Sequence, residues 1–333
     1  MGAAACMLIA LAFAAVVLAK DARVKLIPKF APGERLVYEI EIETVTAGKT
    51  VSPIMNTEGA TQSSLNIGMR ARLDVLSVDP EPAGESVEFR ITWVDSHADA
   101  TSDALDPTRT DPASSFNKLQ GHSVEFTLGA NGGLSGFKGL EDVVPGGIPP
   151  AESVAWIASL TAAGQFPPGG LEPGQKWQAE RPINGAPLAG LYWQTQSIYD
   201  HNEPCAPVGQ DESSSAGKAA KAAPDPGATR ECAVILSQLT IARHGRSSDQ
   251  TPEDYVRNGL RTSGTWTGEG EEMGSIAIEN GLLMSATETS TQNMDYEITS
   301  ASSGSTVYYT AKSQTQTGIT LLADSHGGVS GSE

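Results

Sequence analysis

Two cysteines, Cys205 and Cys232, are the residues whose chemistry the sequence indicates most directly. The stretch between them, residues 211–229, has no large apolar side chain, so we predict a flexible insertion at 206–231. An even cysteine count outside the N-terminal segment suits an oxidising compartment, and we predict a disulfide that closes this loop. Such a closure is worth about 3–4 kcal/mol in the chain-entropy model. The alternative is two unpaired thiols, and we expect no metal there because no further Cys or His stands at ligand spacing.

Carboxylates are the second group of residues that could carry out chemistry. Glu269, Glu271 and Glu272 invite a glycosidase interpretation, although spacing along one segment does not fix how far apart carboxylates lie in space. The acidic stretch Asp95–Asp111, read as a loop, matches no calcium-binding frame. The five histidines are scattered singly, and the nucleophile-elbow and H-E-x-x-H motifs are absent. We therefore expect no catalytic residue, metal or cofactor, with a hydrolase whose site assembles only in space as an alternative.

The formal net charge of −18, from 22 basic and 40 acidic residues, restricts the partners. A nucleic-acid-binding protein needs a basic surface to displace counterions from phosphates, and the chain has no basic cluster. Docking onto an anionic membrane needs the same kind of surface. We expect neither partner.

Residues 6–19 form an apolar run that ends in Val17-Leu18-Ala19. This pattern predicts an export signal at 1–19 with cleavage between Ala19 and Lys20, and a periplasmic or extracellular protein. No Lys or Arg precedes the run, which departs from the usual signal. The alternative is an uncleaved anchor through residues 6–19, the one case in which we expect contact with a membrane.

The elements that must position these residues are strands. Leu36, Tyr38, Ile40 and Ile42 alternate with glutamates, and further segments up to residue 128 repeat this pattern. Alternation with period two is typical of antiparallel strands with one buried face. Asn131-Gly132 and Asn280-Gly281 are strong hairpin signals between apolar stretches.

The predicted fold class is mainly β: a strongly curved antiparallel sheet (a half-barrel, a barrel or two stacked sheets) with one packed α-helix. We place the β domain at 20–323, the helix at 152–163, and a disordered tail at 324–333. A second, short helical turn is expected at 252–258.

Two short motifs carry a family resemblance. Residues 166–177 contain the pattern PP-x-x-x-x-P-G-x-x-W, and residues 32–38 read PGERLVY. Both resemble motifs of uncharacterised exported bacterial all-β proteins, which implies an exported β domain of unknown function over about residues 30–320. In physical terms Gly174 makes a turn and Trp177 anchors the strand that follows in the core. The alternative is a proline-rich linker between two sheets.

The sequence thus favours an exported, non-enzymatic envelope protein with a structural or protein-interaction role, whose Ser/Thr-rich outer face meets another envelope component. The alternative is a half-barrel that binds an apolar or lipid-like ligand beneath the helix. The shape of the sheet separates the two, because an apolar cavity favours ligand binding and a filled core favours interaction.

Overall fold

A computed structural model describes residues 23–52, 59–81, 84–103, 112–130, 133–143, 166–167, 169–183, 186–206, 208, 230–245 and 250–325. The strands are β1 (Arg35–Val51), β2 (Gly59–Glu81), β3 (Gly84–Ser102), β4 (Ser123–Leu128), β5 (Leu134–Lys138), β6 (Lys176–Pro182), β7 (Leu191–Pro204), β8 (Glu231–Arg243), β9 (Leu260–Ala277), β10 (Leu283–Ser300) and β11 (Thr306–Ser325). The helical elements are α2 (Pro112–Asn117), the 3₁₀ turn η1 (Leu140–Asp142) and α4 (Glu253–Arg257).

All described strands belong to one antiparallel sheet, in the order β5-β4-β3-β2-β1-β11-β10-β9-β8-β7-β6. Strands that follow one another in the chain pair with each other, except that β5 and β6 lie at opposite edges of the sheet. In the middle of the sheet, β1 pairs with β11. The predicted antiparallel β fold is confirmed. Both predicted hairpins are present, between β4 and β5 and between β9 and β10.

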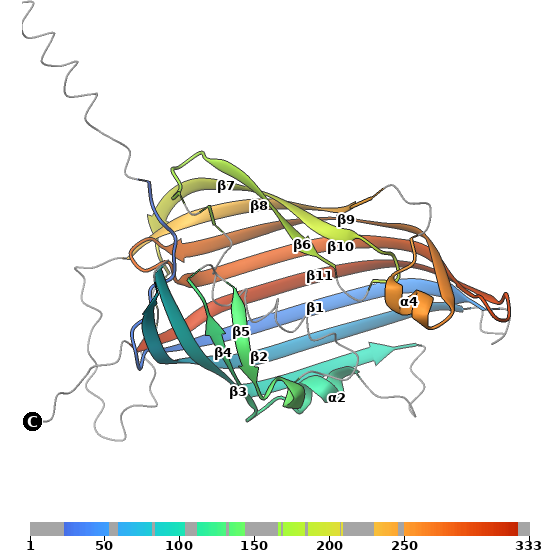
Figure 1. Ribbon diagram of the computed structural model, residues 1–333, viewed down its shortest axis with the longest axis horizontal. Helices are drawn as coiled ribbons and strands as arrows, with labels where there is room; N and C mark the ends of the chain where they lie inside the picture. The colour runs from blue at the N-terminus through green and yellow to red at the C-terminus, as the bar shows by residue number, and fades with distance from the viewer. Residues whose placement is uncertain are drawn as a thin grey trace, which may run out of the picture.

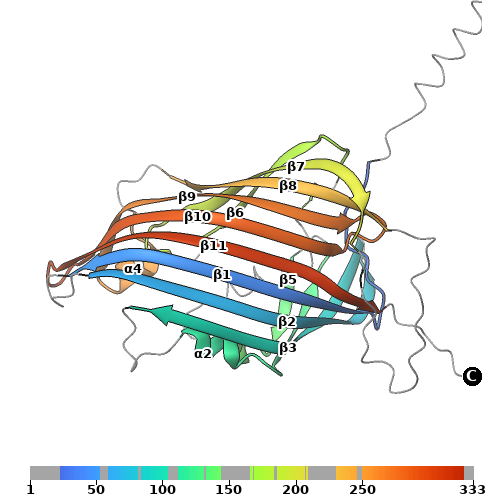
Figure 2. The ribbon, with the colours of Figure 1, turned by 180° about the vertical axis from the view of Figure 1, so that it is seen from behind.

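The sheet is strongly curved. Arg181 on the edge strand β6 forms an ion pair with Glu288 on β10, with Nη2 and Oε2 3.5 Å apart. Four strand spacings would separate these strands by about 19 Å in a flat sheet. The β6 edge therefore curls over the inner face, in front of β9 and β10 in Figure 1. Figure 2 shows the outer face, on which the long strands lie without a described element over them.

The core lies on the inner face, at the end of the sheet where β1 begins. Its largest fully buried side chains include Tyr38, Phe89 and Phe126. Phe89 stacks on Phe126 and meets the edge of Phe30, with ring centroids 5.4 and 4.8 Å apart. Phe30 belongs to the N-terminal segment, whose Val24 exchanges two backbone hydrogen bonds with Leu171. The segments before β1 and β6 thus close this end of the half-barrel.

The two sequence motifs, at residues 32–38 and 166–177, form the same turn. A strand begins after each turn, β1 after the first and β6 after the second. In the first, the Gly33 N–H donates to the Val75 carbonyl, the Val75 N–H donates to the Glu34 carbonyl, and the Glu34 carboxylate accepts from the Ala31 N–H.

The second motif repeats these contacts position by position. Gly174 donates to the Tyr199 carbonyl, Tyr199 donates to the Gln175 carbonyl, and the Gln175 amide oxygen accepts from the Glu172 N–H. Both glycines have positive φ, 79° and 85°. Trp177 then packs against the core and meets the ring of Phe166 edge-on. The predicted turn and anchor are therefore both present.

Several sequence predictions fall outside the described residues. They are the export signal at 1–19, the helix at 152–163, most of the insertion at 206–231, and all but the first two residues of the tail at 324–333. Strand β11 runs to Ser325, two residues beyond the predicted end of the domain. The short helix expected at 252–258 is α4.

Gly174→Ala is expected to lower the free energy of unfolding by about 1–2 kcal/mol, because a side chain in the left-handed region is strained. A Cβ there would meet no atom within 4 Å, so the cost is one of backbone conformation alone. Urea denaturation measures it. The control is Gly318→Ala, where φ is not positive and the space is equally open. Equal stability of the Gly174→Ala variant and the wild type would contradict this account of the motif.

Candidate functional site

A continuous row of hydrogen-bonding side chains crosses the outer face of the sheet. The strand registers place one exposed residue from each of nine neighbouring strands, β6 to β3 in sheet order, directly opposite the next. We name this row the amide ladder; its members are Gln178, Gln196, Gln238, Glu271, Thr289, Gln316, Glu43, Asn66 and Asp99. The strands follow one another at intervals of about 4.8 Å, so the ladder is about 38 Å long.

A second polar row lies two residues along each strand from the ladder. It contains Glu180, Gln194, Thr240, Glu269, Thr291, Gln314, Val45, Ser64 and Thr101. Val45 is the one apolar member. The two rows together form a sheet surface that is rich in amide, carboxylate and hydroxyl groups, all of which form hydrogen bonds.

Two hollows lie along these rows. One, of about 640 Å³, is lined by residues of β8, β9, β10, β11 and β1, including Gln238, Glu271 and Gln316. The other, of about 840 Å³, is lined by residues of β6 to β10. Thr289, in the middle of the ladder, lines both. We name the two hollows together the outer trough.

One wall of the trough carries a short apolar strip. Ile198, Leu236 and Met273 lie opposite one another on β7, β8 and β9, in the row next to the ladder. Leu236 and Met273 are 37% and 48% exposed. Further along the same row stand two glycines, Gly318 and Gly68, which add no side chain.

The trough is acidic. Glu43, Glu269 and Glu271 line it, and Lys176 is the basic residue among its described lining residues. No ion pair of these three glutamates is found within the part of the chain that the structure describes. Among the described residues, these three carboxylates therefore have no neutralising partner.

The inner face carries a different carboxylate pair. Glu272 on β9 lies directly opposite Glu288 on β10, and Glu288 pairs with Arg181. Burial raises the pKa of the Glu272 carboxyl; the charge of Glu288 raises it further, while Arg181 lowers it. Glu272 contributes to the lining of the second hollow, whereas Glu288 lines neither hollow. The three glutamates singled out in the sequence are thus divided, with Glu269 and Glu271 outside and Glu272 inside.

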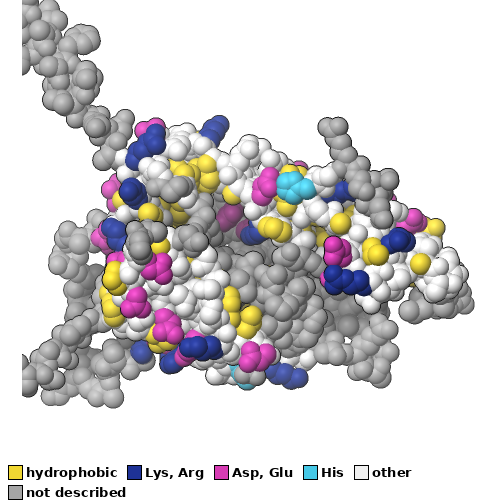
Figure 3. All heavy atoms as spheres, in the orientation of Figure 1, with side chains coloured by type: hydrophobic (Ala, Val, Ile, Leu, Met, Phe, Trp, Pro, Cys, Tyr) yellow, Lys and Arg dark blue, Asp and Glu magenta, His cyan; other side chains and the backbone are white. Residues whose placement is uncertain are grey.

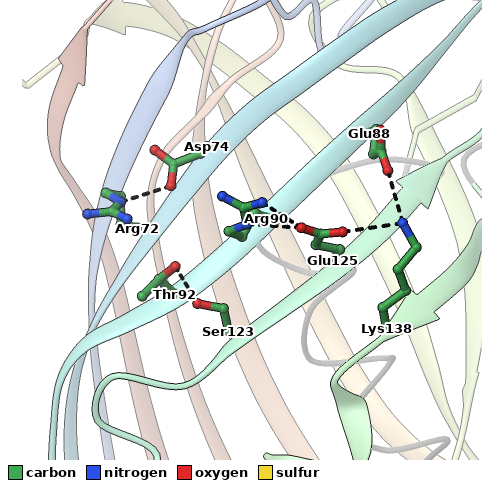
Figure 4. A network of polar contacts seen from close by, with 8 residues as sticks. All are labelled: Arg72, Asp74, Glu88, Arg90, Thr92, Ser123, Glu125 and Lys138. Atoms are coloured by element: carbon green, nitrogen blue, oxygen red, sulfur yellow. Dashed lines mark hydrogen bonds and ion pairs between the residues drawn. The ribbon is translucent and has the colours of Figure 1, made fainter.

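A charged row at one side of the outer face has a structural role. Across β1 to β5 the signs alternate in the order Arg35, Asp74, Arg90, Glu125 and Lys138. Arg90 Nη2 lies 2.6 Å from Glu125 Oε1, and Lys138 Nζ lies 3.3 Å from Oε2 of the same carboxylate. Figure 4 shows Arg72 paired with Asp74, Glu88 paired with Lys138, and Thr92 and Ser123 as a separate hydrogen-bonded pair nearby.

Hydrogen bonds from Arg90 and Lys138 hold the pKa of Glu125 below its ordinary value. Opposite charges on adjacent strands favour one register, so this row aligns β3, β4 and β5. Its charges are satisfied internally, in contrast to those of the trough.

On the opposite side of the molecule, acidic and basic side chains are interspersed over the coloured surface in Figure 3.

The other described residues that the sequence singled out have structural roles. Cys205 and Cys232 form the predicted disulfide at the base of the β7–β8 hairpin. Gly174 and Trp177 open β6, whereas Ala19 and Lys20 lie outside the described residues. The interpretation of 95–111 as a loop was wrong at its start, since residues 95–102 are part of β3, whose pairing with β2 makes them extended.

Within the described ranges no group of three or more His, Cys, Asp or Glu side chains could hold a metal ion. No helix among them is long and apolar enough to cross a membrane.

No protein-family model and no curated protein matches the chain. Among solved structures, a lipovitellin structure concerned with lipid–protein interactions matches 92% of this chain, with 11% identity and a TM-score of 0.45. The chain spans 27% of that lipovitellin chain.

Two bacterial structures match more weakly. A candidate lipoprotein from Parabacteroides distasonis has 11% identity and a TM-score of 0.25, over 92% of this chain and 100% of that one. The outer membrane protein OprG from Pseudomonas aeruginosa has 8% identity and a TM-score of 0.20, over 90% and 100%. Scores this low carry no argument about what this chain binds.

Glu272→Gln is expected to raise the free energy of unfolding at pH 7. Because the pKa of Glu272 is higher in the folded state than in the unfolded one, its protonated form contributes stability that is complete below the unfolded pKa and is lost as pH rises through the folded pKa. The variant keeps a neutral side chain, so its advantage should vanish at acidic pH. Denaturation from pH 4 to pH 8 measures this, with Glu271→Gln on the outer face as the control. A loss of stability at pH 7 would contradict the assignment.

Proposed function

We propose that this chain is an exported, non-enzymatic interaction protein that binds a component of the cell envelope across the outer face of its sheet. The observation that carries the proposal is the amide ladder, which crosses nine strands in register and lies over the two hollows of the outer trough. Continuous arrays of amide, hydroxyl and carboxylate groups offer many hydrogen bonds to a partner that lies along them.

Two further observations support the proposal. The Cys205–Cys232 disulfide suits an oxidising compartment and therefore an exported protein. The inner face at the core end is filled by aromatic and aliphatic side chains such as Phe89, Phe126 and Leu171, all buried. The described residues thus favour the outer face over an apolar ligand inside the half-barrel, which was the alternative from the sequence.

Filling the trough tests the proposal. Thr289→Trp places a large side chain where the two hollows meet, and we expect it to abolish capture of the partner that wild-type protein retains from envelope extract. The matched control is Thr265→Trp, also exposed on the outer face of β9 but outside both hollows. Circular dichroism confirms that both variants fold. Capture of the same partner by Thr289→Trp and by the control would refute an outer-face interaction.

A further inference from the structure

We infer that the occupant of the outer trough is an extended polypeptide segment in which basic and apolar residues alternate on one side. This inference rests on the proposed function and specifies the chemistry of the partner. Charge, hydrogen-bonding capacity, apolar surface and spacing each point to it.

Charge complementarity requires basic groups. Glu43, Glu269 and Glu271 face the trough without an ion pair among the described residues, in a chain of net charge −18. Charge-assisted hydrogen bonds from Lys or Arg side chains would neutralise them. An acidic or phosphorylated partner would be repelled.

The amides match an extended backbone. An extended segment exposes N–H and C=O groups that need partners when they leave water. Gln178, Gln196, Gln238 and Gln316 each offer two donors and one acceptor oxygen, so a single row can satisfy both kinds of backbone group. A compact cation would leave most of this capacity unused.

The apolar strip distinguishes a polypeptide from a glycan. Leu236 and Met273 are exposed beside the ladder and can cover an aliphatic side chain of the partner. Sugar rings stack on exposed aromatic faces, and Trp177, the aromatic residue among the described lining residues of the trough, packs instead against the core and the ring of Phe166.

The distance between the trough glutamates sets the spacing of basic residues in the partner. Glu271 and Glu43 stand three strand steps apart on the ladder, about 14 Å at 4.8 Å per strand. A segment crossing the strands advances about 3.4 Å per residue, so residues i and i+4 span the same distance and point to the same side. The partner therefore carries basic residues four positions apart, and an apolar residue two positions beyond the one at Glu271, on the side of β8 and β7 where Leu236 and Ile198 lie.

Titration with a synthetic peptide, three repeats of Lys-Thr-Val-Thr, tests this inference. We expect saturable binding to the full chain that weakens with salt. The triple variant Glu43→Gln, Glu269→Gln, Glu271→Gln should bind about tenfold more weakly, since each exposed ion pair contributes a few-fold. The matched control removes the same charge elsewhere, through Glu81→Gln, Glu85→Gln and Glu141→Gln, and should bind as the wild type does.

A peptide of the same composition, with its three lysines in one block, separates pattern from net charge. Equal binding of the two peptides, an equal loss of binding in both triple variants, or tighter binding of a neutral glucan oligosaccharide would each overturn the inference. If the peptide fails to bind while Thr289→Trp still loses the envelope partner, this inference is wrong and the proposed function stands. If Thr289→Trp keeps that partner as well, both fail.

Discussion

In-register antiparallel pairing connects every part of this molecule, because it turns the sequence of each strand into rows that run across the sheet. Side chains alternate between faces along a strand, so a slip of one residue would exchange the core with the surface. The same registers that bring Tyr38 beside Leu321 inside bring Glu43 beside Gln316 outside. Core, charged row, amide ladder and outer trough are therefore consequences of one set of strand pairings.

Much of the fold follows from local patterns. The alternation at Leu36–Ile42 predicts β1, the Asn280-Gly281 pair predicts the β9–β10 hairpin, and the paired cysteines predict the disulfide. Each of these signals lies within a few residues or, for the disulfide, across one hairpin. The motif glycines, Gly33 and Gly174, are also readable locally because each stands in a turn before a strand.

The candidate site could not be predicted in the same way. Gln238, Glu271 and Gln316 come from three different strands, and they become neighbours only through registers that no local pattern specifies. The sequence does show a Ser-, Thr- and Gln-rich C-terminal third, but not which residues align. The sequence predicts a strongly curved sheet, but it does not show which strands the curvature brings together, such as the edge strand β6 and β10, which the Arg181–Glu288 contact joins.

The central claim is that a partner lies on the outer trough, and carboxyl footprinting tests it most directly. Carbodiimide labelling of the protein, free and bound to the alternating basic peptide, reports the accessibility of each carboxylate by mass spectrometry. The account predicts protection of Glu43, Glu269 and Glu271 in the complex, with unchanged labelling of Glu81 and Glu85 at the β2–β3 end. Equal labelling of the trough glutamates in both states would contradict it.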